Sequence, residues 1–126
     1  MGTVYARIRL SNDLRPDLEA IEVNALVDSG AINLCIPEGL RSQLGLKARK
    51  RRVAEMADGS TLEVEMVAPI TVEFENRETT TTAMVIGNEV LLGAIPMQDL
   101  DVLIDPRNER LLVNPEHPNF ALSKVK

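Results

Sequence analysis

Residues 25–31 read Ala-Leu-Val-Asp-Ser-Gly-Ala, and this stretch determines how the rest of the chain is interpreted. An apolar run ends at the carboxylate of Asp28, which is followed by the hydroxyl of Ser29 and by Gly30. Asp, Ser and Gly are all common turn residues, so the tripeptide alone is also compatible with an ordinary surface turn. The apolar run favours a second interpretation, because a buried strand would deliver Asp28 to a partly dry site where a carboxylate can act as an acid or a base.

The residues before this stretch alternate between apolar and polar side chains, which is typical of half-buried strands. The alternation predicts one strand over residues 3–10 and a second over residues 21–27, which enters the core as it reaches Asp28. Beyond the motif, residues 31–36 are mostly apolar. A short helix is then predicted over residues 37–45, because a proline begins this segment and a glycine ends it.

The segment 52–67 carries an Asp-Gly turn, and the alternation of its side chains selects the loop length. A three-residue loop at 57–59 pairs Met56 with Ser60 and puts its glycine in the left-handed conformation. The apolar side chains of the hairpin then share one face: Ala54, Met56, Leu62, Val64 and Met66. A two-residue loop would divide this set between the two faces.

The rest of the chain predicts further short elements separated by turn residues. They are a hairpin over 70–86 with its turn near 76–78, a strand at 90–92, a helical turn or two at 96–100 and a hairpin over 102–113. Seven or eight short strands with one or two short helices predict a mostly-β fold with a closed or folded-over sheet. The 126 residues fit one domain, 1–126.

Composition and charge exclude several classes of function. Hydrophobic residues make up 44% of the chain and charged residues 26%, the composition of an ordinary folded protein. The net charge of −5 and an aromatic content of 2% argue against a nucleic-acid binder, which needs basic surfaces or stacking platforms. The single Cys35 and the single His117 exclude an intrachain disulfide and a Cys/His zinc site, and no metal or cofactor is expected. We expect His117 to be exposed in a polar tail.

The N-terminal residues give no indication of membrane insertion or export. Arg7 and Arg9 lie where a signal peptide would be apolar. No apolar run approaches the ~20 residues of a membrane span. We therefore expect a cytoplasmic protein that does not contact a membrane.

A second motif, Leu91-Leu92-Gly93, follows the hairpins. The order Asp-Ser-Gly, hairpins, then hydrophobic-hydrophobic-Gly resembles the retropepsin-like aspartic proteases of clan AA, in particular their bacterial single-domain relatives. The resemblance covers the chain from the first strand to Val113. It implies that the two motif strands cross in a ψ-shaped loop, that the hairpin at 52–67 is a flap over a cleft, and that two half-sites make one active site.

The resemblance also implies roles for individual residues. Asp28 would be the catalytic aspartate, Ser29 would hydrogen-bond across a dimer, and Gly30 would let the backbone approach the substrate. Leu91, Leu92 and Gly93 would support the ψ-loop. The residues expected to contact the substrate are Ala31, Met56, Ala57, Asp58, Gly59 and Leu92.

One chain carries one Asp-Ser-Gly motif, so the resemblance implies a homodimer. Two carboxylates a few ångströms apart cannot both ionise in a dry cleft, so one keeps a proton while the other stays charged. The charged member activates a water and the protonated member stabilises the oxygen on which charge develops. The expected activity is therefore that of an aspartic endopeptidase acting on peptide or protein substrates.

The chain departs from retroviral members at the expected dimer interface. Those enzymes place an Asp two positions after the motif glycine and an Arg directly after the ψ-loop glycine, whereas this chain has Ile32 and Ala94 there. Both ionic partners are missing together, so no charge is left unpaired. The interface must then be built differently, with the terminal segments as one source.

Two other functions stay open on the sequence. A catalytically silent domain of the same fold would serve as a dimerisation or peptide-binding module. An unrelated β-rich domain would use the Asp-Ser-Gly tripeptide only as a turn.

A basic run precedes the flap: Lys47, Arg49, Lys50, Arg51 and Arg52. The rest of the chain has 9 basic and 19 acidic residues, a net charge of −10. The run is interpreted either as a docking site for an acidic partner or substrate or as a solvated loop that leads into the flap.

Overall fold

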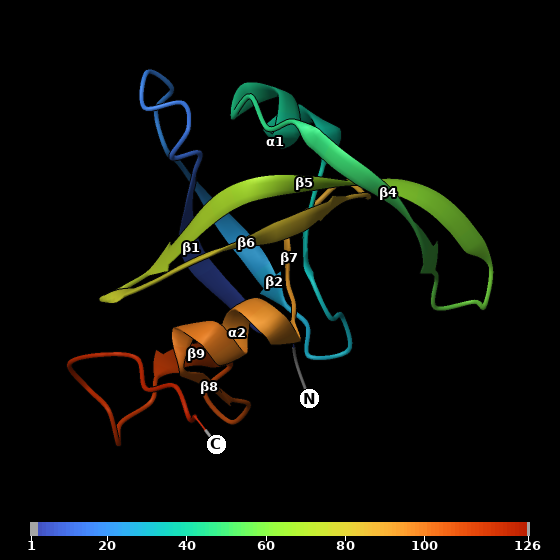
Figure 1. Ribbon diagram of the computed structural model, residues 1–126. Helices are drawn as coiled ribbons and strands as arrows, with labels where there is room; N and C mark the ends of the chain where they lie inside the picture. The colour runs from blue at the N-terminus through green and yellow to red at the C-terminus, as the bar shows by residue number, and fades with distance from the viewer. Residues whose placement is uncertain (1–2, 126) are drawn as a thin grey trace.

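The computed structural model describes residues 3–125 of the chain (Figure 1). Within that range it has nine strands and two short helices. In chain order these are β1 (Tyr5–Ser11), β2 (Ile21–Val27), β3 (Leu34–Ile36), α1 (Glu38–Gln43), β4 (Ala48–Glu55), β5 (Thr61–Phe74), β6 (Arg77–Val85), β7 (Leu91–Leu92), α2 (Ala94–Leu100), β8 (Val102–Asp105) and β9 (Arg110–Val113). The predicted mostly-β class is confirmed.

β1 illustrates how alternation produces the strands of this chain. Its even-numbered side chains, Ala6, Ile8 and Leu10, are buried, and the odd-numbered ones between them are exposed. β2 pairs with β1 in antiparallel orientation and places Val23 opposite Ile8. β2 has the predicted bounds, and β1 begins two residues later than predicted.

Six strands form a closed ring. Their order is β1-β2-β7-β3-β6-β5, and β5 pairs again with β1, where Val72 lies opposite Leu10. β4 is the last strand of the sheet beyond β5, and β8 and β9 form a separate two-stranded sheet. The core inside the ring is aliphatic apart from Phe74, as the low aromatic content requires, and its fully buried members include Leu34, Ile70 and Leu92. The closed sheet predicted from the short strands is therefore present.

β5 is longer than predicted and joins the two predicted hairpins into one continuous element. Its 14 residues pair first with β4 and then with β1, while β6 follows its other edge. The register with β6 shifts between Val67 and Ile70, around Pro69, which has no N–H to donate. Val67 and Ile70 both face the core across this irregularity. The β4–β5 hairpin projects away from the ring beyond it (Figure 1).

Three further boundaries differ from the predicted ones. β4 begins at Ala48, four residues earlier than predicted, so most of the basic run lies inside the strand and not in a loop before it. The turn of the next hairpin is formed by Glu75 and Asn76, with Glu75 at φ 51°. α2 begins at Ala94, two residues earlier than predicted.

α1 ends as its sequence predicts. Gly45 adopts the left-handed conformation, with φ 61°, and the Leu46 N–H donates to the carbonyl of Arg41 at 3.0 Å. This pattern satisfies carbonyls that the last helical turn would otherwise leave without partners. Within residues 3–125, no helix is long and apolar enough to cross a membrane.

The segment after β9 folds back onto the end of α2 through Asp101. This residue ends α2 at φ 55°, and its carboxylate accepts hydrogen bonds from the Leu122 N–H and from Asn114 Nδ2, each at 3.0 Å. These two bonds, with a smaller contribution from His117, lower the pKa of Asp101 to about 2. The prediction that His117 is exposed is wrong, since its side chain is 25% exposed and contacts Asp101.

Candidate active site

Asp28 lies immediately after β2, where the strand leaves the ring. Its N–H donates to the carbonyl of Leu92 at 3.1 Å, which ties the motif to β7. Its Oδ1 accepts the N–H of Gly30 at 2.9 Å. A Cβ at residue 30 would lie 3.2 Å from that same oxygen. Glycine therefore avoids crowding the carboxylate. The side chain is half-buried, whereas Ser29 and Gly30 are exposed.

The loop at 28–33 crosses β7 to join β2 and β3. β7 pairs parallel with β2, through Leu26 opposite Leu91, and antiparallel with β3, through Cys35 opposite Leu91. Two strands consecutive in this part of the chain are thus separated by a third one that comes from far along it. This is the ψ-shaped crossing that the family resemblance implies.

Gly93 is required at the crossing because the loop passes very close to its backbone. A Cβ there would lie 2.2 Å from the carbonyl oxygen of Asn33 and 2.8 Å from that of Ala31. The close approach lets the Ala94 N–H donate to Ala31 at 2.8 Å and the Ile95 N–H donate to Ile32 at 2.9 Å. Together with the bond from the Asp28 N–H to Leu92, these bonds hold the Asp-Ser-Gly loop to the backbone on both sides of Gly93.

A row of apolar side chains extends from this crossing across the outer face of the sheet. Cross-strand neighbours point to the same face, so the register defines the row from strand to strand. Its members are Met66 on β5, Met84 on β6, Cys35 on β3, Leu91 on β7 and Leu26 on β2. None of the five belongs to the main core cluster, whereas their chain neighbours Leu34, Val67, Ala83 and Leu92 do. The row therefore lies on the face away from the core.

Asp28 belongs to the same face, because it follows Leu26 by two residues. We call the row of five side chains the cleft floor, after the substrate site that it would line; two of its members, Met66 and Cys35, are buried. Burial raises the pKa of the Cys35 thiol, and the negative charge of the Asp28 carboxylate raises it further. The effect of Asp28 indicates that this part of the cleft floor lies close to it. A thiol kept protonated in this way is a poor nucleophile, so Cys35 contributes apolar surface.

The β4–β5 hairpin, which we call the flap hairpin after the role that the family resemblance implies for it, has the loop predicted for it. The Met56 N–H donates to Ser60 O at 2.8 Å, the Gly59 N–H donates to Met56 O at 2.9 Å, and Gly59 has φ 87°. Ala57 and Asp58 complete the loop and are exposed. Ala54 faces Leu62 as predicted, and the tip curls toward the side on which the 28–33 loop lies (Figure 1).

Asp58 is engaged inside the turn. Its Oδ1 accepts hydrogen bonds from the Ser60 hydroxyl and from the Ser60 N–H, the latter at 2.9 Å. Both bonds, the hydroxyl first, lower the pKa of the Asp58 carboxyl. This carboxylate stabilises the tip in the conformation described.

The structure places one of the predicted substrate contacts, Leu92, in the core. Leu92 is fully buried in the main core, and its carbonyl accepts the Asp28 N–H, so its side chain supports the loop from inside the ring. Leu91, on the opposite face, is the residue of this motif that lies on the cleft floor. The other predicted contacts, Ala31 and the four flap residues, lie at the loop and at the flap tip.

Three residues of the floor were missed by sequence reasoning. From the sequence alone, Cys35 is interpreted as a small buried hydrophobe, Leu26 as a strand residue and Leu91 as ψ-loop support, whereas Met66 and Met84 are interpreted either as lining of a peptide pocket or as core filler. The signal was present in the alternation, because each of the three is adjacent to a residue that faces the core. It could be read only once the register of β2, β3 and β7 was known.

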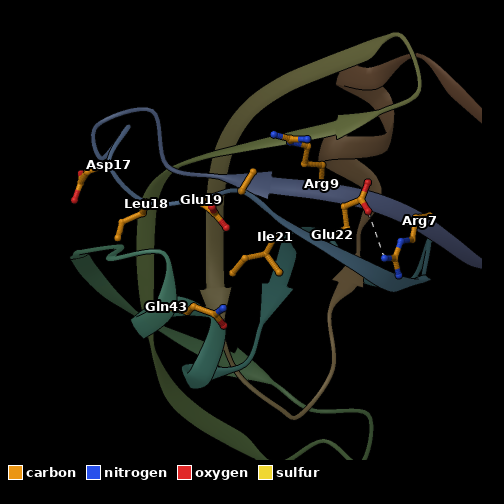
Figure 2. A pocket seen from close by; sticks show the side chains of 9 residues that line it. Arg7, Arg9, Asp17, Leu18, Glu19, Ile21, Glu22 and Gln43 are labelled. Atoms are coloured by element: carbon orange, nitrogen blue, oxygen red, sulfur yellow. Dashed lines mark hydrogen bonds and ion pairs between the residues drawn. The ribbon is translucent and has the colours of Figure 1, made fainter.

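A separate hollow of about 770 Å³ lies on the surface of β1 and the turn before β2 (Figure 2). Its charged residues include Arg7 and Glu22, which pair with each other at 3.4 Å and are both exposed. None of its lining residues belongs to the 28–33 loop or to the flap hairpin. Within residues 3–125, no three His, Cys, Asp or Glu side chains are grouped so that they could hold a metal ion.

The comparisons with known proteins agree with this geometry. The family model described as gag-polyprotein putative aspartyl protease matches residues 17–111. No curated protein matches the chain. The matched segment contains both motifs, the ψ-shaped crossing and the flap hairpin. With three quarters of its residues covered, the chain belongs to the retropepsin-like aspartyl protease family.

Proposed function

We propose that the chain is an aspartic endopeptidase that acts as a homodimer, in which each copy supplies one Asp28. The observation that carries this proposal is the position of Asp28 at the ψ-shaped crossing, on the face that also carries the cleft floor. A single copy holds one carboxylate there, and the aspartic-protease mechanism needs two in opposite protonation states. A second copy related by two-fold symmetry would bring the other.

The two carboxylates would divide the reaction between them. The charged Asp28 takes a proton from a water that attacks the peptide carbonyl carbon, while the protonated Asp28 of the second copy donates a hydrogen bond to the carbonyl oxygen. The tetrahedral intermediate then loses the amine, which leaves with a proton from the dyad. Ser29 is proposed to hydrogen-bond across the dimer and hold the two loops together.

Exposed apolar side chains beside the motif support the dimer. Ile32 is 65% exposed and Ile95 is 41% exposed, and the Ile95 N–H donates to the Ile32 carbonyl. Together they form a small apolar surface next to the Asp-Ser-Gly loop, which a second copy could cover. Ile32 stands where retroviral relatives have the acidic member of an ion network, so the interface here would be apolar at that point.

The proposal is tested by cleavage of a peptide library between pH 4 and 7 with wild-type protein and with Asp28→Asn. We expect cleavage by the wild type only, since Asp28→Asn removes the dyad but keeps the size and the hydrogen bond from Gly30. Thermal unfolding of both proteins checks that the fold persists. Equal cleavage by both would overturn the proposal, and peptide binding by both without cleavage would favour the silent module.

A further inference from the structure

The basic run on β4 is divided by the strand between two faces of the flap hairpin. Lys50 lies opposite Met66 and Arg52 lies opposite Val64, so both basic side chains share the face of the buried apolar residues. Arg51 lies on the other face, opposite Glu65. The alternation along β4 therefore places Lys50 and Arg52 on one face of the hairpin and Arg51 on the other.

The face that carries Lys50 and Arg52 is continuous with the cleft floor. Met66, the cross-strand neighbour of Lys50, is the first member of the floor row that ends beside Asp28. Five strand spacings of about 4.8 Å separate β4 from β2, so a flat sheet would put Lys50 about 24 Å from the Asp28 strand. An extended peptide covers that span with about seven residues.

The two charges on this face are available to a ligand. Both side chains are exposed, and neither has an ion-pair partner within 4.0 Å among residues 3–125. On the other face, Arg51 pairs with Glu63 at 3.3 Å. The remainder of the molecule is acidic, so these residues form a positive region on a negative protein.

We propose that Lys50 and Arg52 make the cleft selective for peptides that carry an acidic side chain several residues away from the scissile bond. The inference rests on the proposed function, since it names the substrate class of the same cleft. The acidic body of the protein disfavours such a peptide elsewhere, and Lys50 and Arg52 attract it at the flap. Close to the scissile bond the preference reverses, because Asp28 would repel a second carboxylate there.

The experiment compares peptides that differ by one Glu→Gln exchange at each of seven positions on either side of a cleaved bond. We expect wild-type kcat/KM to favour Glu at one or more distal positions by about five- to tenfold, the size expected for two partly exposed ion pairs. Lys50→Gln with Arg52→Gln should remove the preference. Raising the salt from 50 to 500 mM should weaken it in the wild type, because exposed charges are screened.

Matched variants distinguish this role from a general effect of charge. Arg51→Gln removes the same charge from the same strand but from the opposite face, and it should keep the preference. Lys50→Glu with Arg52→Glu should favour basic peptides instead, and Lys50→Arg with Arg52→Lys should behave as the wild type. A wild type that treats Glu and Gln alike at every position, or an Arg51→Gln variant that loses the preference equally, would overturn the inference.

A binding measurement separates failure of this inference from failure of the proposed function. Labelled Glu and Gln peptides are titrated with Asp28→Asn and followed by fluorescence anisotropy. Tighter binding of the Glu peptide, lost with Lys50→Gln and Arg52→Gln, supports the inference even if the wild type cleaves nothing. Equal binding of the two peptides overturns it even if the wild type is an active protease.

Discussion

Oδ2 of Asp101 lies 2.7 Å from Nδ1 of His117 and joins the end of α2 to the C-terminal segment. The same oxygen accepts the Leu122 N–H, and Oδ1 accepts Asn114 Nδ2. One carboxylate therefore holds three points of a segment that follows the last strand of the fold.

The first prediction concerns this carboxylate and pH. The pKa of Asp101 falls from 3.8 to about 2 on folding, so its stabilising effect is complete above pH 3.8 and is lost as the pH falls toward 2. Asp101→Asn should lower the melting temperature at pH 6, and the difference from wild type should shrink below pH 4. Thermal unfolding by circular dichroism across pH 2–7 measures this. Glu116→Gln, an exposed change in the same segment, should leave the curve unchanged.

The second prediction concerns the close contact at the ψ-shaped crossing. Gly93→Ala would place a Cβ 2.2 Å from the Asn33 carbonyl oxygen, which is backbone and cannot move aside locally. We expect destabilisation of about 2–4 kcal/mol and loss of any Asp28-dependent cleavage. Gly39→Ala is the matched control, since its Cβ would meet nothing within 4 Å. That change lies within α1 and should stabilise by about 0.5–1 kcal/mol in urea unfolding.

The third prediction concerns the pH–rate profile of peptide cleavage. The proposed dyad needs one protonated and one charged carboxylate, so activity should rise and then fall on the acidic side of neutrality. The two limbs of the profile give apparent pKa values that belong to the pair of carboxylates and not to either residue alone. Initial rates between pH 3 and 9 measure it. A rate that continues to climb above pH 8 would indicate a different reaction chemistry.

The fourth prediction concerns the proposed dimer. Ile32→Glu would bring two unpaired carboxylates into an apolar interface, at a cost of several kcal/mol. Sedimentation velocity should show a monomer, and cleavage should be lost although the monomer remains folded. Leu14→Glu, at an exposed residue of the β1–β2 turn, should remain dimeric. Dimers of unchanged affinity in Ile32→Glu would place the interface elsewhere.

The fifth prediction concerns the flap tip. Gly59 has φ 87°, and a Cβ there would meet nothing within 4 Å, so the cost of Gly59→Val is conformational and not steric crowding by neighbours. We expect a tip destabilised by about 1–3 kcal/mol and a higher KM, because under the proposed function the flap closes over the substrate. Gly59→Asn should have a smaller effect, since Asn tolerates the left-handed region better than Val. An unchanged KM in Gly59→Val would argue against flap closure on the substrate.

The local sequence pattern was sufficient to predict a strand wherever one face of that strand is buried and the other is exposed to solvent. The bounds of β2 and the three-residue loop at the flap tip follow from period-two alternation and from one glycine. The order of the two motifs was sufficient to predict the crossing, because the family resemblance supplies the topology that alternation cannot. These features position Asp28.

Pattern was insufficient where both faces are covered or where the contact is distant. Leu91 and Leu92 read alike in sequence, and only their partners on β2 and β3 decide which of them faces the core. The Asp101–His117 contact joins residues 16 apart through a segment without regular structure. The second half of the proposed active site would come from another copy, so no property of one chain specifies its geometry.

β4, with its row of basic side chains, is also the free edge of the sheet. An edge strand exposes unpaired N–H and C=O groups, which can pair with the same edge of another molecule and begin aggregation. Arg49, Lys50, Arg51 and Arg52 give every copy the same positive charge along that edge, so two such edges repel each other. The flap can thus keep an open backbone edge in a concentrated solution, and a variant stripped of all four charges would be expected to precipitate before it could be assayed.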